Sequence, residues 1–114
     1  MKITNIIIQD SQNKNKRLTA KIFIQDSNKP LVRHFGSKNA YTFFDGADDT
    51  KRNNYIKRHS KNNENWQDIT TPGALSRYVL WSLRNQKNIQ TLIKQKFNIP
   101  NVSINISKKK SQNL

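Results

Sequence analysis

The sequence predicts an α+β fold, a small antiparallel sheet of three to four strands packed with two to three helices. Apolar residues alternate with polar ones near both ends of the chain, as in strands with one buried face. Between residues 51 and 97 the apolar residues recur at helical spacing instead. A chain of 114 residues suits one domain. We therefore expect a single domain over 1–107, followed by a basic, disordered tail over 108–114.

Three strands are expected in the first third of the chain. The first covers about 2–8 and ends in three consecutive isoleucines, the second covers 18–25 with strict alternation, and the third covers 31–35 and ends at Gly36. Polar residues typical of turns separate them. Alternation returns over 102–106, which predicts a late strand that rejoins the N-terminal sheet.

The first predicted helix runs from about residue 51 to 61, with Asp49 or Thr50 as its N-terminal cap. At 100° per residue, one arc of this helix carries Tyr55 and His59 and is expected to face the core. The opposite arc is basic and is expected to face solvent or phosphate. It holds Lys51, Lys57, Arg58 and Lys61.

A second helix is expected to begin near Thr71, because Pro72 suits a first helical turn. Its expected buried stripe is Leu75, Val79 and Leu83. A third helix runs over about 89–97, where apolar residues recur at helical spacing, and a proline follows at position 100.

The charge of the chain is its clearest functional signal. It has 21 Lys and Arg against 7 Asp and Glu, a formal net charge of +14. Frequent Asn, Lys and Ile indicate A/T-rich codons, but such a bias should also raise Glu, and Glu64 is the only one. Codon bias therefore does not explain the charge. A field this strong favours an acidic partner, and nucleic acid is the first candidate.

Several other functions find little support in the sequence. There is no cysteine, no long apolar segment near the N-terminus and no run long enough to span a membrane. We therefore expect a protein that is neither secreted nor bound to membranes. No glycine-rich phosphate loop or nucleophile elbow is present, so we expect no enzymatic activity and no cofactor.

A metal-dependent nuclease is a remote alternative. The possible ligands are Asp45, Asp48, Asp49, Glu64 and His59. However, no recognised metal-binding spacing occurs, and the two adjacent aspartates lie where a helix cap is needed.

Three sequence blocks carry a resemblance. They are VRHFG at 32–36, YIKRH at 55–59 and TPGALSRYVLW at 71–81, with Glu64 and Trp66 between the last two. Together they resemble a family of small basic proteins encoded by large DNA viruses of algae and amoebae. That family pairs a Y-x-x-R-H helix with a downstream tryptophan and an A-G-x-x-S-R-W-x-L-W-like block. Here the order is Gly73–Ala74, and Tyr78 stands at the aromatic position. The resemblance implies a viral origin, with the virion or a viral factory in the host cell as the location.

Charge and resemblance together predict a non-enzymatic protein that binds nucleic acid. We expect it to bind DNA without sequence specificity and to package or condense a viral genome. The alternative is a minor capsid or other virion protein that bridges acidic protein surfaces through exposed apolar anchors such as Trp81 and Tyr78. The expected nucleic-acid contacts are Lys51, Lys57, Arg58, Lys61, Arg77, Trp81, Arg84, Lys108, Lys109 and Lys110.

Two of these roles stay open at the level of sequence. Arg77 and Trp81 lie one helical turn apart, so they can form a cation–π pair or two halves of a binding site. Alternatively, Trp81 packs in the core and Arg77 bridges to Glu64 or Asp68. In the same way, His59 either acts with Arg58 on a phosphate or packs beside Tyr55.

Overall fold

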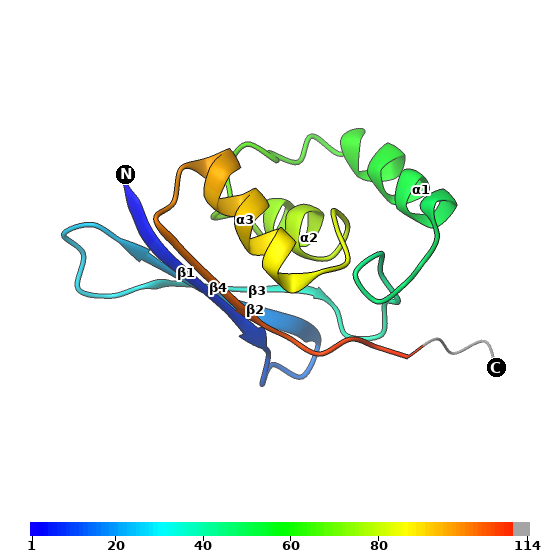
Figure 1. Cartoon of the computed structure of the whole chain (residues 1–114), viewed down its shortest axis with the longest axis horizontal. Helices are drawn as coiled ribbons and strands as arrows, with labels where there is room; N and C mark the ends of the chain where they lie inside the picture. Colours follow the sequence, from blue (N-terminus) through cyan, green and yellow to red (C-terminus); the bar gives the residue numbers. More distant parts are fainter. Residues whose placement is uncertain (111–114) are drawn as a thin grey trace.

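The computed structural model describes residues 1–110 and confirms the α+β class (Figure 1). Four strands and three helices occur in this part of the chain. In order they are β1 (Ile3–Asp10), β2 (Lys16–Ile24), β3 (Leu31–Ser37), α1 (Asp49–Ser60), α2 (Pro72–Val79), α3 (Gln86–Phe97) and β4 (Asn101–Asn105). None of the helices described is long and apolar enough to cross a membrane.

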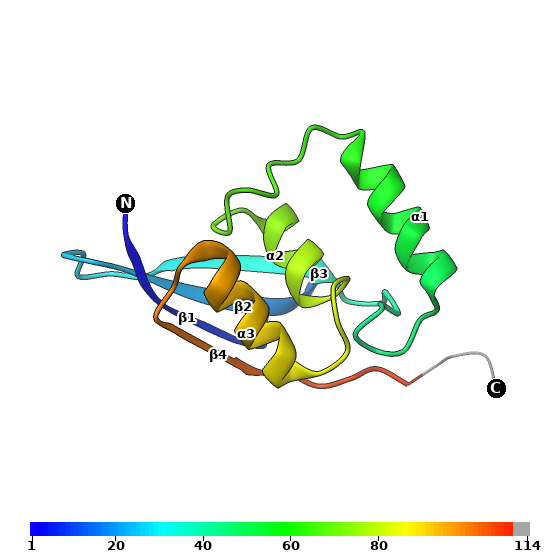
Figure 2. The same cartoon turned by 45° about the horizontal axis from the view of Figure 1, so that its top comes forward.

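The sheet has the strand order β3-β2-β1-β4. The hairpins β1–β2 and β2–β3 are antiparallel, whereas β4 pairs in parallel with β1, with Ile6 opposite Val102. The late strand thus returns to the N-terminal sheet as predicted, but the sheet is mixed and not antiparallel. A parallel pair needs a long crossover, and the three helices provide it on one face of the sheet (Figure 2).

The core lies between this face of the sheet and helices α2 and α3. The alternating residues of β1 and β2 point into it, and apolar residues of α2 and α3 meet them. The fully buried members include Ile6, Ile8, Leu18, Ala20, Ile22, Leu75, Val79, Ile89 and Ile93. Helix α1 lies to one side of this core, farther from the sheet (Figures 1 and 2).

Two predictions about helix ends are wrong. The cap of α1 is Asp48, whose side chain accepts a hydrogen bond from the backbone N–H of Lys51, and not Asp49 or Thr50. Helix α2 ends at Val79, so Leu83 lies beyond it and is 38% exposed. Leu75 and Val79 are buried as predicted. The spacing that placed Leu83 in the same stripe requires a helix one turn longer than the one that forms.

The chain after β4 stays in contact with the domain. The backbone N–H of Lys109 donates to Asp45 Oδ1 at 2.7 Å. Lys108 Nζ donates to the carbonyl oxygens of Phe44 at 2.5 Å and Arg84 at 2.7 Å. Contacts therefore continue past residue 107, where the expected tail begins. Residues 111–114 of that tail lie outside the described part of the chain.

Candidate functional site

Helix α1 presents the basic surface that the sequence predicted. Lys57, Arg58 and Lys61 are exposed and line, with Asn54 and Asn62, a shallow hollow of about 550 Å³. We call these five residues the α1 basic surface. Lys51, also exposed, does not line this hollow, and its Nζ lies 5.5 Å from the centre of the Tyr41 ring.

Internal ion pairs leave almost all of the positive charge unneutralised. Within residues 1–110, Arg17 is the only Lys or Arg that pairs with a carboxylate, that of Asp45. The other pair in this range joins His59 and Glu64. The lysines and arginines on the surface therefore remain available to an external polyanion.

Trp81 belongs to the core and not to an exposed stacking surface. Its side chain is 6% exposed, and its ring stacks on Tyr55 with ring centres 4.3 Å apart. Of the two roles left open by the sequence, the one in which Trp81 packs in the core is therefore confirmed, and Trp81 presents no exposed ring to nucleic acid.

Arg77 does not bridge to Glu64 or Asp68, which corrects that interpretation. Its Nη1 donates to the carbonyl oxygen of Trp81 at 3.2 Å, and Arg52 Nε donates to the same oxygen at 3.0 Å. The Arg77 guanidinium also lies 5.4 Å from the ring centre of Trp66. Burial, with the nearby charge of Arg52, lowers the pKa of Arg77. Arg77 thus anchors the end of α2 from a half-buried position.

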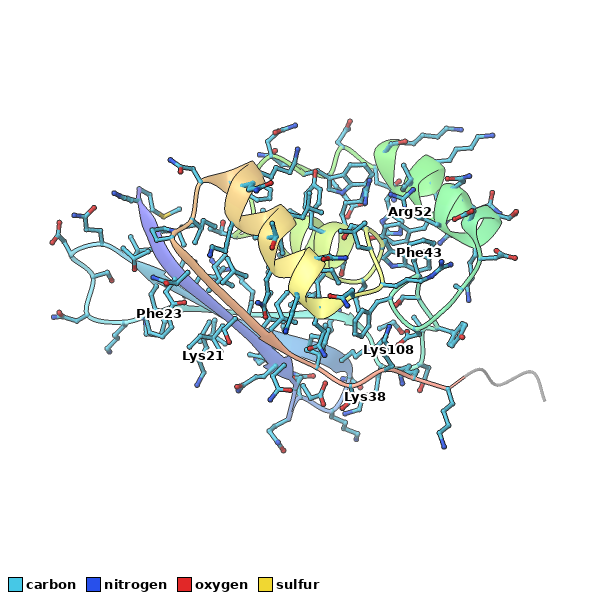
Figure 3. The ribbon with its side chains drawn as sticks, viewed as in Figure 1. Lys21, Phe23, Lys38, Phe43, Arg52 and Lys108 are labelled. Atoms are coloured by element: carbon cyan, nitrogen blue, oxygen red, sulfur yellow. The ribbon has the colours of Figure 1, made fainter. Side chains whose placement is uncertain are left out.

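Arg84 and Lys108 come together beside Phe43 and Phe44. The Arg84 guanidinium lies 3.9 Å from the centre of the Phe43 ring, and Lys108 Nζ lies 4.1 Å from that of Phe44. Arg52 approaches Phe43 as well, at 5.3 Å; Figure 3 labels Arg52, Phe43 and Lys108. Carbonyl oxygens, and no carboxylate, accept the hydrogen bonds of these cations within residues 1–110. Lys109 and Lys110 were also expected to contact nucleic acid; Lys109 is half-buried and Lys110 is exposed.

A cleft of about 470 Å³, which the sequence did not predict, lies between the end of β3, α1 and α2. Phe35, Leu80 and Trp81 contribute its apolar lining, and the exposed residues Lys16 and Arg58 reach it from β2 and α1. We call it the α1–α2 cleft. The lining also includes Ser37, Tyr55, His59, Glu64, Gly73 and Ser76.

A histidine–carboxylate pair forms one wall of this cleft. His59 Nδ1 and Glu64 Oε2 are 2.5 Å apart, and the two side chains are 30% and 22% exposed. His59 also stacks on Tyr55 at 4.1 Å, so that His59, Tyr55 and Trp81 form a continuous stack of three rings. Burial, with the charge of Glu64, raises the pKa of Tyr55 to about 12. The Tyr55 phenol is therefore neutral at physiological pH.

The possible metal ligands named above are not gathered in one place. Asp45 bonds Arg17, Asp48 caps α1 and Glu64 bonds His59. Across residues 1–110, no group of three or more His, Cys, Asp or Glu side chains could hold a metal ion.

The sequence carried one signal for the cleft. The segments 32–36, 55–59 and 71–81 supply much of its lining, from Phe35 in the first to Trp81 in the last. Because these segments are up to forty-odd residues apart in sequence, their convergence becomes visible only in the folded chain.

A family model matches part of the chain. The model of a family of unknown function, DUF5754, matches residues 6–59, from β1 to the end of α1. The matched segment includes Tyr55, Arg58 and His59 of the cleft but neither Glu64 nor α2. No curated protein and no solved structure matches the chain.

Proposed function

We propose that this protein binds nucleic acid, duplex DNA above all, without sequence specificity, through the α1 basic surface. In this proposal it is a protein of a large DNA virus that packages or condenses the genome in the virion. The observation that carries the proposal is the cluster of Lys57, Arg58 and Lys61 on an exposed helical face, in a chain whose surface cations have no carboxylate partners within residues 1–110.

The chemistry of the surface suits phosphates more than base edges. Lys and Arg side chains that replace condensed counterions supply affinity that is independent of sequence. The amides of Asn54 and Asn62 can donate to phosphate oxygens beside them. Phosphate contacts fix the position of a protein on the duplex but carry no sequence information, which is the reason for proposing non-specific binding.

Burial of the aromatic side chains favours this proposal over the minor capsid alternative. A protein that bridges virion subunits needs apolar anchors, and the expected anchors Trp81 and Tyr78 are only 6% and 9% exposed. Among residues 1–110, the exposed large apolar side chains are Met1, Val32 and Leu83, which come from different parts of the fold. They do not form the apolar centre that a stable protein interface requires.

Fluorescence anisotropy with a labelled DNA duplex at several salt concentrations tests the proposal. If about five phosphates are neutralised, the plot of log K against log salt should have a slope of about −4 to −5. Replacing Lys57, Arg58 and Lys61 by alanine should reduce the magnitude of that slope by about 3. No binding at low salt would overturn the proposal.

A matched control separates a defined surface from a diffuse charge effect. Lys21, Lys29 and Lys94 are also exposed but lie on β2, in the β2–β3 turn and on α3. Their replacement by alanine removes the same charge. If the control lowers the slope as much as the α1 variant does, the α1 basic surface is not the binding site. For the virion role, the protein should remain with released DNA and not with empty capsid shells after particles are disrupted.

A further inference from the structure

We propose that the α1–α2 cleft binds a single nucleotide, supplied either as a free nucleoside monophosphate or as the terminal nucleotide of a strand. The cleft is a different site from the α1 basic surface proposed to bind duplex DNA, although Arg58 lines both. The proposal depends on the size of the cleft, the nature of its lining and the two cations that border it.

The cleft has the dimensions and apolar lining of a small-ligand site. Its volume of about 470 Å³ falls within the range of about 300–1,000 Å³ that such sites occupy. Phe35, Leu80 and Trp81 form the floor of the cleft. The more exposed Pro72 and the His59 ring give it sides against which a flat heterocycle can pack. The three floor side chains are held in the core and are only 1%, 1% and 6% exposed, so they close the cleft from below.

The basic side chains suit the phosphate of such a ligand. Lys16, the first residue of β2, and Arg58, near the end of α1, both line the cleft and are exposed. Neither forms an ion pair with a carboxylate within residues 1–110. Two cations from separate elements can therefore contact one phosphate while the base lies deeper in the cleft.

Glu64 provides a selective contact for the base. Its Oε2 lies at hydrogen-bond distance from His59 Nδ1, whereas Oε1 receives no hydrogen bond from any group within residues 1–110. An ionised carboxylate only accepts hydrogen bonds, so Oε1 favours a base edge with a projecting exocyclic amino group over the ring N3–H of thymine, which is flanked by two carbonyl oxygens that repel a carboxylate. Adenine, guanine and cytosine have one, and thymine does not. Ser37 and Ser76 also line the cleft, and their hydroxyls can donate hydrogen bonds to the acceptors of the base.

The surrounding residues hold Glu64 in this place. His59, stacked on Tyr55, fixes one carboxylate oxygen. Gly73 leaves room for the other, because a Cβ there would lie 2.5 Å from Glu64 Oε1. A carboxylate held through one oxygen, with space for it beside Gly73, is partly pre-organised, and pre-organisation lowers the entropic cost of binding.

Titration of the full chain with deoxyadenylate and with thymidylate, followed by NMR shifts of the cleft residues, tests the proposal. Deoxyadenylate should bind at millimolar concentration or below and more tightly than thymidylate. The affinities of a 5′-phosphorylated dinucleotide and of its unphosphorylated form then distinguish the two sources. If the site takes the terminal nucleotide of a strand, the added phosphate should increase the affinity of the dinucleotide; if the site takes only a free mononucleotide, it should not. Absence of shifts in the cleft at ten millimolar nucleotide, or equal affinity for thymidylate, would overturn the site as described.

Three variants locate the binding. Arg58→Ala should weaken deoxyadenylate binding by about tenfold, through loss of a charge-assisted hydrogen bond, whereas the neighbouring Lys57→Ala, outside the cleft, should change it little. Ser76→Leu should fill the cleft and abolish nucleotide binding without affecting duplex affinity. If that variant does not fold, Glu64→Gln takes its place and should remove the preference for deoxyadenylate over thymidylate. Equal losses from Lys57→Ala and Arg58→Ala would show a general charge effect and refute the site, while the duplex titration tests the proposed function separately.

Discussion

The Arg17–Asp45 pair and the His59–Glu64 pair each join a basic side chain to a carboxylate, but they lie in very different surroundings. The side chains of Arg17 and Asp45 are 6% and 0% exposed, and those of His59 and Glu64 are 30% and 22% exposed. The first pair joins segments that are far apart in the sequence, whereas the second spans only five residues and borders a cleft.

Asp45 is saturated with hydrogen bonds. Both of its oxygens accept from the Arg17 guanidinium, and the backbone N–H and hydroxyl of Thr42 and the backbone N–H of Lys109 also donate to it. Arg17 in turn donates to the carbonyl oxygen of Ser107. The pair thus connects β2, the loop before α1 and the segment after β4. Glu64, in contrast, has one oxygen, Oε1, that accepts no hydrogen bond from residues 1–110. The fully bonded carboxylate of Asp45 stabilises the fold, whereas the partly bonded carboxylate of Glu64 can accept a hydrogen bond from a ligand in the cleft.

The largest effect should follow from breaking the buried pair. Asp45→Asn removes the charge opposite Arg17 and should lower the free energy of unfolding by about 3–5 kcal/mol, because it leaves a buried cation uncompensated. Chemical denaturation measures this loss. Asp26→Asn, at an exposed turn between β2 and β3, makes the same chemical change and should have almost no effect. A loss under about 1 kcal/mol for Asp45→Asn would mean that the pair behaves like a surface ion pair.

The same pair predicts how stability depends on pH. Burial alone would raise the pKa of Asp45, but the hydrogen bonds from Arg17, Lys109 and Thr42 outweigh it and lower that pKa below its usual value. A lowered pKa in the folded state contributes stability that is present above the unfolded pKa of about 3.9 and is lost as the pH falls through the folded value. Denaturant melts between neutral pH and pH 2 should therefore show a smaller acid-dependent loss for Asp45→Asn than for the natural sequence. Asp68, whose pKa is lowered mainly by Thr70, titrates in both proteins and cancels in the comparison.

A smaller loss should follow from removing residues 108–114. This truncation deletes the Lys109 N–H that bonds Asp45 and the two carbonyl contacts of Lys108. At about 1 kcal/mol for a hydrogen bond, the expected loss is about 1–3 kcal/mol. The double variant Lys108→Ala, Lys109→Ala keeps the backbone N–H and should lose less. An unchanged melting curve after truncation would show that these residues contribute charge alone, as expected of a disordered tail.

Much of the fold could be predicted from the sequence because local patterns determine it. The isoleucine run in β1, the alternation in β2 and β4, the helical spacing in α1 and α3 and the basic arc of α1 all reflect which side chains face the core. The direction of β4 could not be predicted in this way, because alternation is the same in a parallel and an antiparallel strand. Nor could the end of α2, since Leu80 and Trp81 continue the apolar pattern after the helix has stopped and no glycine or proline follows it.

The sites depend on contacts between distant residues, which local patterns do not reveal. Asp45 was visible only as one of three clustered acids, and nothing in its neighbourhood indicates Arg17, 28 residues away. Arg77 was expected to find a nearby carboxylate and instead bonds a backbone carbonyl at the end of its own helix. Carboxylate, carbonyl and hydroxyl oxygens can all accept from a guanidinium, so the type of residue alone does not identify its partner. The cleft needs β3, α1 and α2 in place before it exists.

The smallest effect on stability should come from the second pair. Glu64→Gln keeps the shape of the side chain and an oxygen that can accept from His59, and both partners are already partly solvated. We therefore expect it to lower the free energy of unfolding by about 1 kcal/mol, the upper end for solvent-exposed ion pairs, because this pair is only partly solvated. Chemical denaturation of this variant beside Asp45→Asn tests the contrast directly, since each replaces one carboxylate by its amide. If Glu64→Gln is as destabilising as Asp45→Asn, then Glu64 mainly holds α1 against the start of α2, and its Oε1 has no need of a ligand. A small effect on stability, together with an altered response of the cleft to nucleotides, would assign Glu64 to binding and leave Asp45 as the carboxylate that holds the fold together.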